Sequence, residues 1–236
     1  SGAATTLTGV VTPQAGYKAK YFDLARKHTH PFAESVEAAS NFFKLMNSNT
    51  DAHFGFVAFN QLAGQVATTT FQEELVASNY PAGGTRLFPL PAIDLNAAVG
   101  QTNAEQVQTA LAQTVPDGNT NIGGALNRAQ AMFSAQTNRP NAKKAIILFT
   151  DGTPTVGNPS PEQACFTAAN LCRQKGIAVF IIGLSLDASE RSEQAQVCNQ
   201  ITGIAGNGGR FFQVTDASKL NAAFSSIARN LTQLNQ

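Results

Sequence analysis

The stretch that decides the fold runs from residue 144 to residue 184 and reads KAIILFTDGTPTVGNPSPEQACFTAANLCRQKGIAVFIIGL. It begins and ends with apolar runs of strand length, Lys144–Thr150 and Ile177–Leu184. Between them, the pattern predicts a helix over Glu162–Gln174 that ends at Gly176. Buried apolar strands joined by a helix are typical of a parallel sheet that helices cover on both faces.

The same alternation continues on both sides of this unit. Apolar side chains recur at three- and four-residue spacing from Phe32 to Met46, which predicts an amphipathic helix beginning near Pro31. His53–Phe59 is predicted as a strand, with Gln65–Phe71 as its hairpin partner. The remaining predicted elements are helices over Glu105–Thr114, Ile122–Gln136, Ser189–Thr202 and Ala217–Gln233, and a strand over Arg210–Val214. We therefore expect an α/β fold with an open, mostly parallel sheet.

The chain reads as one domain. We expect an irregular segment or loop insertion over residues 1–30, followed by a single domain over residues 31–236. Residues 78–101 form a connection rich in Pro and Gly that is longer than typical loops, which indicates a functional loop or an insertion.

Composition excludes several classes of protein. The chain is 43% hydrophobic and 13% charged, against roughly 25% charged residues in an average soluble domain. Its 16 basic and 15 acidic residues give a net charge of +1, which argues against a nucleic-acid binder and against disorder. No apolar run approaches the roughly 20 residues of a membrane span, and the start at Ser1 indicates a removed leader or a fragment. Low charge with many Thr, Asn and Gln residues suits an extracellular or cell-envelope protein.

Two polar loops are expected at the carboxyl ends of the strands, where open α/β sheets bind ligands. Asp151 directly follows an apolar strand, and Thr120 stands at the start of a predicted helix, with Asn121 beside it as a capping residue. A hydroxyl and a carboxylate are hard oxygen ligands suited to Mg²⁺ or Mn²⁺.

These segments, TNIGGAL from Thr120 and LFTDGTPT around Asp151, resemble the von Willebrand factor A (VWA) family. The resemblance implies a VWA or Rossmann-like sheet. It also implies a metal-ion-dependent adhesion site in which Thr120 and Asp151 hold Mg²⁺, or Mn²⁺ or Ca²⁺, directly or through water. The open position of the ion would then accept a carboxylate of a partner protein.

The chain departs from that family at one point. The family's site begins with Asp-x-Ser-x-Ser at the end of the first, central strand, and no such motif occurs here. Thr6–Val11 (TLTGVV) is the only candidate strand before Pro31, and it lacks an Asp. Because a missing central strand would leave its neighbours unpaired, we expect the strand from a segment or chain outside residues 1–236. The alternative is a degenerate metal site.

The carboxyl-terminal third, with CRQKGIAVFIIG from Cys172 and RFFQVTDASKLNAAFSSIA from Arg210, is similar to VWA regions of bacterial tight-adherence (TadG-like) pilus-assembly proteins. Those proteins are held in the envelope by a membrane segment. Three cysteines are too few for a disulfide scaffold and lack zinc-site spacing, which leaves one bridge plus a free thiol, or three buried thiols. The resemblance implies that Cys198 pairs with Cys165 or Cys172.

The leading hypothesis is a non-enzymatic VWA binding module in cell-surface adhesion or pilus-like assembly. A second is a degenerate VWA domain with a structural role in a surface filament, and a third is a partner subunit of a cytoplasmic ATPase or chelatase. An enzyme is not expected, because no nucleophile elbow or Ser/His/Asp set falls at strand ends. We interpret His28 and His30 as part of a solvated loop, and His53 as a half-buried residue that packs against its neighbours.

Overall fold

The structure is a computed structural model. It describes residues 32–49, 52–63, 68–69, 86–87, 93, 95, 104–114, 119–133, 141–185 and 187–233. The predictions for residues 1–30, including His28, His30 and Thr6–Val11, lie outside these residues, as do most of the predicted strand Gln65–Phe71 and most of the 78–101 connection.

A parallel sheet of three strands forms the centre of the described fold, in the order β3 (Lys144–Thr150), β4 (Ile177–Leu184), β5 (Phe211–Val214). β3 and β4 pair over their full length, from Lys144 opposite Ile177 to Thr150 opposite Gly183. The predicted bounds of β3 and β4 are confirmed, and those of β5 are confirmed within one residue.

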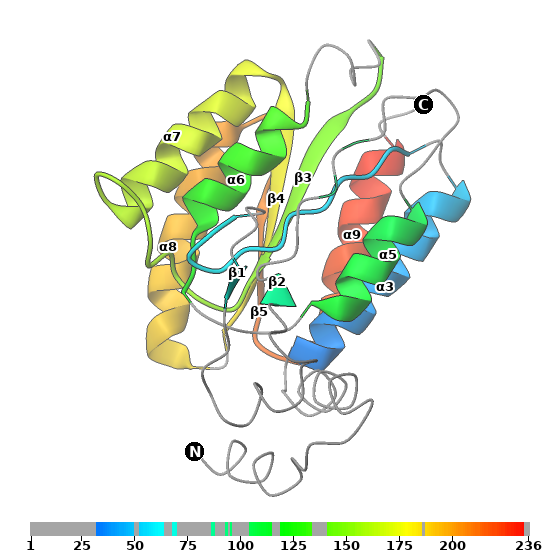
Figure 1. The fold of residues 1–236 in the computed structure, drawn as a ribbon, viewed down its shortest axis with the longest axis horizontal. Coiled ribbons are helices and arrows are strands. Elements are labelled where there is room, and N and C mark those ends of the chain that lie inside the picture. The colour runs from blue at the N-terminus through cyan, green and yellow to red at the C-terminus, as the bar shows by residue number, and fades with distance from the viewer. Residues whose placement is uncertain are drawn as a thin grey trace, which may run out of the picture.

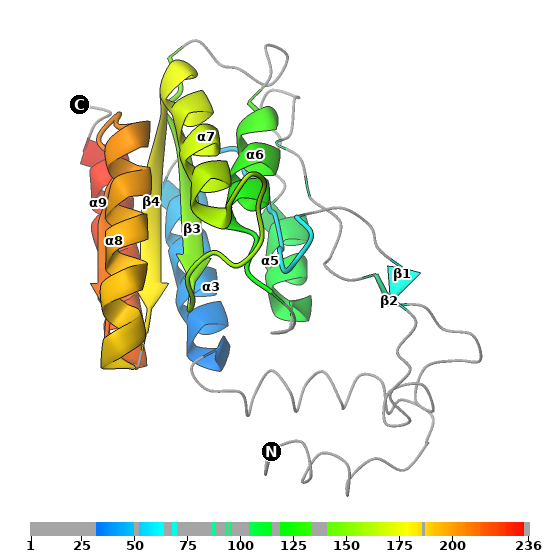
Figure 2. The same ribbon diagram turned by 90° about the vertical axis from the view of Figure 1, so that its left-hand side faces the viewer.

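Helices cover both faces of this sheet, as Figures 1 and 2 show. α6 (Ile122–Ala131), α7 (Pro161–Gln174) and α8 (Ala188–Ala205) lie on one face. α3 (Phe32–Asn49) and α9 (Leu220–Gln233), which follows the short 3-10 helix η1 (Ala217–Lys219), lie on the other. α5 (Ala104–Gln113) packs beside α3.

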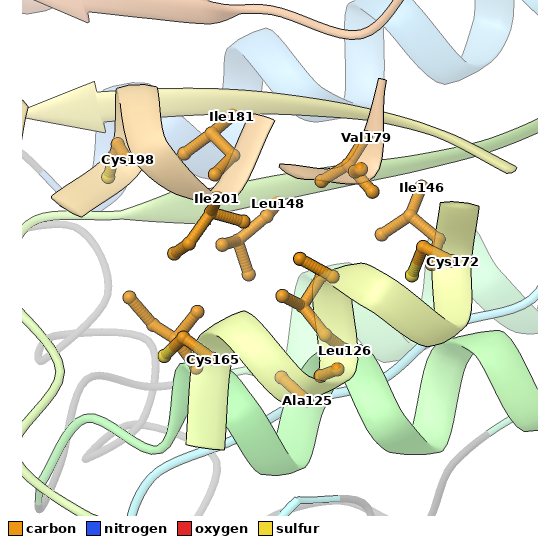
Figure 3. Close-up of a cluster of buried hydrophobic side chains, with 14 of the residues drawn as sticks. Ala125, Leu126, Ile146, Leu148, Cys165, Cys172, Val179, Ile181, Cys198 and Ile201 are labelled. Carbon is orange, nitrogen blue, oxygen red and sulfur yellow. The ribbon is translucent and has the colours of Figure 1, made fainter. Parts of the chain in front are cut away.

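β4 is the most deeply buried strand of the described sheet, because all eight of its residues are buried. Its side chains alternate between the two faces. Ile177, Val179 and Ile181 pack against α6, α7 and α8. Figure 3 shows Val179 and Ile181 in this cluster. Phe180 and Ile182, which point the other way, pack against α9. The sequence KAIILFT … IAVFIIGL thus makes the doubly covered sheet that was predicted from it.

Polar side chains set where the helices begin. Asn121 caps α6 by accepting a hydrogen bond from the Gly124 N–H at 2.8 Å, and Ser160 caps α7 through the Gln163 N–H at 3.2 Å. These caps fix the loops that precede the helices, and those loops lie at the carboxyl end of the sheet.

The region around His53–Phe59 differs from its prediction. Among the described residues it forms only isolated antiparallel bridges, Phe56 with Ile93 and Phe59 with Ala63, rather than a strand paired with 65–71. The two residues described as strand within 65–71, β1 (Thr68–Thr69), pair instead with β2 (Arg86–Leu87). A regular ladder needs a neighbour along its length, and the described structure gives this segment only single bridges.

Two helix ends also differ. α6 ends at Ala131 rather than Gln136, because the Gln130 carbonyl accepts from the Lys175 Nζ at 3.0 Å and from the Phe133 N–H in a tightened last turn. α8 runs to Ala205 instead of Thr202, and Gly206 ends it at a φ of 62°.

The three cysteines are free, buried thiols in the core between α7, α8 and the sheet (Figure 3). Burial raises the pKa of Cys165 and Cys198 to about 12, and that of Cys172 to about 11. The disulfide implied by the family resemblance is not seen, and it stays a prediction.

Candidate metal and partner site

A pocket of about 270 Å³ lies at the carboxyl ends of β3 and β4. Both residues proposed from the sequence, Thr120 and Asp151, line it. The other lining residues are Gly152, Thr153, Thr155, Ser185, Glu190, Glu193 and Gln194. The fold therefore brings the two polar loops of the sequence to one place.

The loop that carries Thr120 is tied to the loop after β3 by its backbone. The Thr120 N–H donates to the Thr155 Oγ1 at 2.9 Å, and the Thr155 N–H donates back to the Thr120 carbonyl at 2.9 Å. The next N–H, of Asn121, donates to the Asn60 carbonyl at 2.9 Å. None of these three bonds uses the Thr120 hydroxyl, so the side chain is positioned by its backbone.

Asp151 is exposed and begins the turn that follows β3. The Thr150 hydroxyl closes this turn by donating to the Gly152 carbonyl at 2.9 Å, and the Gly152 N–H lies 3.3 Å from the same oxygen. A Cβ placed on Gly152 would lie 3.6 Å from the Thr120 Oγ1. The Thr120 hydroxyl therefore faces the Asp151–Gly152 turn.

Sequence reasoning missed the part of the pocket that comes from β4 and α8. Ser185 follows β4 just as Asp151 follows β3, and that spacing was the available signal. Glu190 and Glu193 are exposed on the first turns of α8. Because they lie in a helix without a motif, the sequence alone gave no reason to choose them.

The start of α8 is fixed by Asp187, which accepts hydrogen bonds from the Ser189 hydroxyl and from the Ser189 and Glu190 N–H groups. These bonds, the Ser189 hydroxyl first, hold the pKa of Asp187 below its ordinary value. Ser185 donates to the Asp187 carbonyl at 3.0 Å, so this cap also orders the β4–α8 loop.

Gln194 forms the buried floor of the pocket and is fully buried. Its Nε2 donates to the Thr150 carbonyl at 3.5 Å, a long bond, and its Oε1 has no partner among the described residues. A buried, unpaired acceptor beneath a polar pocket is the least satisfied group of the site.

The chemistry of the pocket suits a hard cation. Its side chains offer carboxylates from Asp151, Glu190 and Glu193, and hydroxyls that include Thr120 and Ser185. Oxygen donors of this kind are the ligands of Mg²⁺, Mn²⁺ and Ca²⁺. In the described part of the chain, however, no three His, Cys, Asp or Glu side chains are grouped closely enough to hold an ion. A bound cation would need the hydroxyls, water and further ligands as well.

Comparisons with known proteins give the same fold. A family model described as the von Willebrand factor type A domain matches residues 83–226. A search of curated proteins found no match. The division of the chain at residue 31 is untested and stays a prediction.

Three similar solved structures come from bacteria. The pilus adhesin SpaC of Lactobacillus rhamnosus GG superposes with a TM-score of 0.59 at 15% identity, over 84% of this chain and 28% of that one. A von Willebrand factor type A protein from Catenulispora acidiphila gives 0.53 at 18% identity, over 83% and 37%. The PilB minor pilin of Streptococcus sanguinis gives 0.55 at 17% identity, over 90% and 54%. The chain thus spans between about a quarter and about half of these proteins, and the likeness is one of fold.

Proposed function

Because this chain belongs to the von Willebrand factor type A family, we propose that it is a non-enzymatic module that binds a protein partner at the carboxyl end of its sheet. The observation that carries the proposal is the pocket shared by Thr120 and Asp151, which two separate loops bring together. Fold alone does not give function, so the proposal rests on this site.

A divalent cation, Mg²⁺ or in its place Mn²⁺ or Ca²⁺, is the proposed link to the partner. Thr120 and Asp151 would hold the ion, directly or through water, and the acidic side chains of Glu190 and Glu193 would favour its positive charge. An open position on the ion would then accept a carboxylate of the partner.

The proposed setting is the cell surface, in adhesion or in a pilus-like assembly. The fold is shared with a pilus adhesin and a minor pilin, and the sequence resembles VWA regions of tight-adherence pilus-assembly proteins. Within the part of the chain that the structure describes, no helix has the length and apolar character of a membrane span. The structural role in a surface filament is the second candidate, and it needs no cation.

A thermal melt tests the cation. The chain is unfolded in EDTA and then with excess Mg²⁺ or Mn²⁺. A ligand at 100 times its dissociation constant stabilises by roughly 2.7 kcal/mol, which for a domain of this size raises Tm by about 5–10 °C. We expect this rise in the wild type, and its loss in Asp151→Ala and in Thr120→Val, which removes the hydroxyl but keeps the backbone bonds.

Glu162→Gln is the matched control. Glu162 is an exposed carboxylate at the start of α7 and does not line the pocket. Its variant should keep the full metal-dependent rise. A wild-type chain that melts at the same temperature in EDTA and in Mn²⁺ would overturn the proposed cation and leave the structural role.

A further inference from the structure

The two ends of the sheet differ in charge. The strands β3, β4 and β5 are parallel, so their amino ends lie at one end of the sheet and their carboxyl ends at the other. The helices α3, α6, α7, α8 and α9 run against the strands, so they begin at the carboxyl end of the sheet and finish at its amino end (Figure 2). The place of a charged residue within its element therefore tells at which end of the sheet it lies.

Acidic side chains collect at the carboxyl end of the sheet. Each of the three strands is followed by an aspartate in the next turn, and the first two turns of α3, α7 and α8 carry glutamates. We call the exposed carboxylates of this end the acidic end: Glu37, Asp151, Glu162, Asp187, Glu190, Glu193 and Asp216. The basic side chains described there are only the exposed Lys219 of η1 and the half-buried Arg191 of α8.

Basic side chains collect at the opposite end. Lys143 precedes β3, Arg210 precedes β5, Arg173 lies in the last turn of α7, Lys175 follows α7, and Arg229 lies in the second half of α9. All five are exposed, and we call them the basic end. Among the described residues, no acidic side chain lies at this end of the sheet.

Contacts between three elements hold part of the basic end together. The Lys175 Nζ donates to the Gln130 carbonyl, near the end of α6, at 3.0 Å, and the Lys144 Nζ donates to the Lys175 carbonyl at 3.4 Å. The end of α6, the end of α7 and the start of β3 are thus joined. Carbonyl groups accept these hydrogen bonds but carry no net charge, so the positive charge of both lysines remains.

The two ends do not cancel each other within one molecule. The eight residues of β4, at about 3.3 Å per residue, separate them by roughly 26 Å, whereas the Debye length is about 8 Å at physiological ionic strength. A helix end contributes only about half a charge, of the sign opposite to these side chains, which offsets part of the charge at each end. The chain as a whole has a net charge of +1, so its charge is low in total and separated in space.

We propose that the acidic end of one copy of this chain binds the basic end of a second copy, so that the protein associates head to tail. The argument for a second copy is charge complementarity, because the chain itself presents both surfaces. Surfaces that stay apart usually have the two signs of charge interspersed, and here they are separated. The contact needs no cation and no partner carboxylate at the candidate site, so it goes beyond the proposed function and can fail independently of it.

The geometry of the contact determines the kind of assembly. Because two different surfaces meet, the interface is heterologous, and each copy that binds leaves a further acidic end and a further basic end exposed. A contact of this type does not stop at a dimer. Charge attraction that acts between exposed groups also weakens as salt shortens the Debye length.

Sedimentation of the wild-type chain tests both consequences, in buffer that contains EDTA so that no divalent cation neutralises the acidic end. In about 0.01 M salt, where the Debye length is about 30 Å, the average mass should rise with concentration past that of a dimer. In about 1 M salt, where the Debye length is about 3 Å, association should be at least tenfold weaker. A chain that stays monomeric in low salt, stops at a dimer, or associates equally in both salts would overturn the proposal.

Charge-reversal variants identify the two surfaces. Lys143→Glu with Arg173→Glu impairs the basic end, and Glu162→Lys with Glu190→Lys impairs the acidic end. Each double variant alone should associate at least tenfold more weakly than the wild type. An equimolar mixture should form a one-to-one dimer and nothing larger, because each variant supplies the end that the other has lost. A mixture that associates no better than either variant alone would contradict a head-to-tail contact.

Lysines at helix starts also act on the fold, so two further comparisons are included. Glu162→Gln with Glu190→Gln removes the same carboxylates and replaces the lysine variant if that variant does not fold. Lys219→Glu changes the net charge as much as Arg173→Glu does, but at the acidic end. Arg173→Glu should weaken association, and Lys219→Glu should leave it unchanged or strengthen it. Equal weakening by both would show that net charge alone acts, and would overturn the proposal.

A carbodiimide, which joins an amine to a carboxylate without a spacer, gives the structural readout. In low salt we expect cross-links from Lys143 and Lys175 to Glu162 and Glu190, identified by mass spectrometry. These groups lie at opposite ends of the sheet, roughly 26 Å apart, so such a bond joins two copies. Associated chains that lack these cross-links would contradict the proposed contact.

An anionic surface is the other candidate for the basic end. In that case the chain would remain monomeric in low salt and would bind vesicles that contain phosphatidylglycerol. The variant Lys143→Glu with Arg173→Glu would lose this binding. That result would assign the basic end to an anionic surface and overturn head-to-tail association.

Discussion

Replacing Gln194 with methionine should stabilise the protein. Gln194 is fully buried beneath the site, where a Cβ on Gly183 would lie only 2.7 Å from its Oε1. No group in the described part of the chain bonds to that oxygen, and leaving it unpaired costs about 1–3 kcal/mol. The one bond of the side chain, 3.5 Å from Nε2 to the Thr150 carbonyl, is at the limit of hydrogen-bond geometry, so its loss costs about 0.5 kcal/mol.

Methionine keeps the length and much of the shape of glutamine while removing both polar atoms. The balance of these terms is a gain of about 0.5–2.5 kcal/mol, which corresponds to a Tm higher by roughly 1–10 °C. Urea unfolding in EDTA measures it as a higher midpoint with an unchanged slope.

Two further variants serve as controls for this measurement. Gln194→Ala leaves a cavity, and by analogy with buried Met→Ala changes it should cost about 2–5 kcal/mol. Gln200→Met, at an exposed position of the same helix, should change stability by less than about 0.5 kcal/mol. If Gln194→Met lost more than about 1 kcal/mol, the Oε1 would hold a polar partner, and the reasoning from an unpaired acceptor would be refuted.

Three further predictions use other parts of the fold. Gly209→Ala should cost about 1–3 kcal/mol in a thermal melt, because its Cβ would clash with the Val179 carbonyl oxygen. Gly203→Ala, at a helical position with open space around it, should instead gain about 0.5–1 kcal/mol. Equal effects of the two changes would contradict the β4–β5 packing. The folded pKa of Asp187 lies below its ordinary value of 3.8, so its ionised side chain stabilises the fold fully above that pH, and the stabilisation is lost as the pH falls through the folded pKa. The difference in Tm between the wild type and Asp187→Asn should therefore shrink below about pH 4. A constant difference would show that the charge of Asp187 does not stabilise the fold. Because burial raises the pKa values of Cys165, Cys172 and Cys198, a thiol reagent at pH 8 should react on the order of 100-fold slower with the native than with the denatured chain. In the denatured chain the reagent should count three thiols. A count of one would show the disulfide implied by the resemblance.

The second half of the chain was predictable because its elements are decided locally. Lys144–Thr150 and Ile177–Leu184 are apolar runs bounded by polar turns, and their bounds are confirmed. Helix ends that depend on distant groups were not predictable. The end of α6 is set partly by the Lys175 side chain, which reaches the Gln130 carbonyl from after α7. No pattern within residues 122–136 indicates that contact.

The candidate site, like the fold, could be predicted from the sequence only in part. Thr120 and Asp151 could be found because each stands in a motif at a loop that a parallel sheet brings to one edge. Gln194 could not, because its role comes from burial against Gly183 and Thr150, which only the packing of α8 on the sheet creates. The strand predicted at His53–Phe59 fails for a related reason. Strand sequence alone does not make a ladder, and this segment borders a cavity of about 1150 Å³ instead of a described strand.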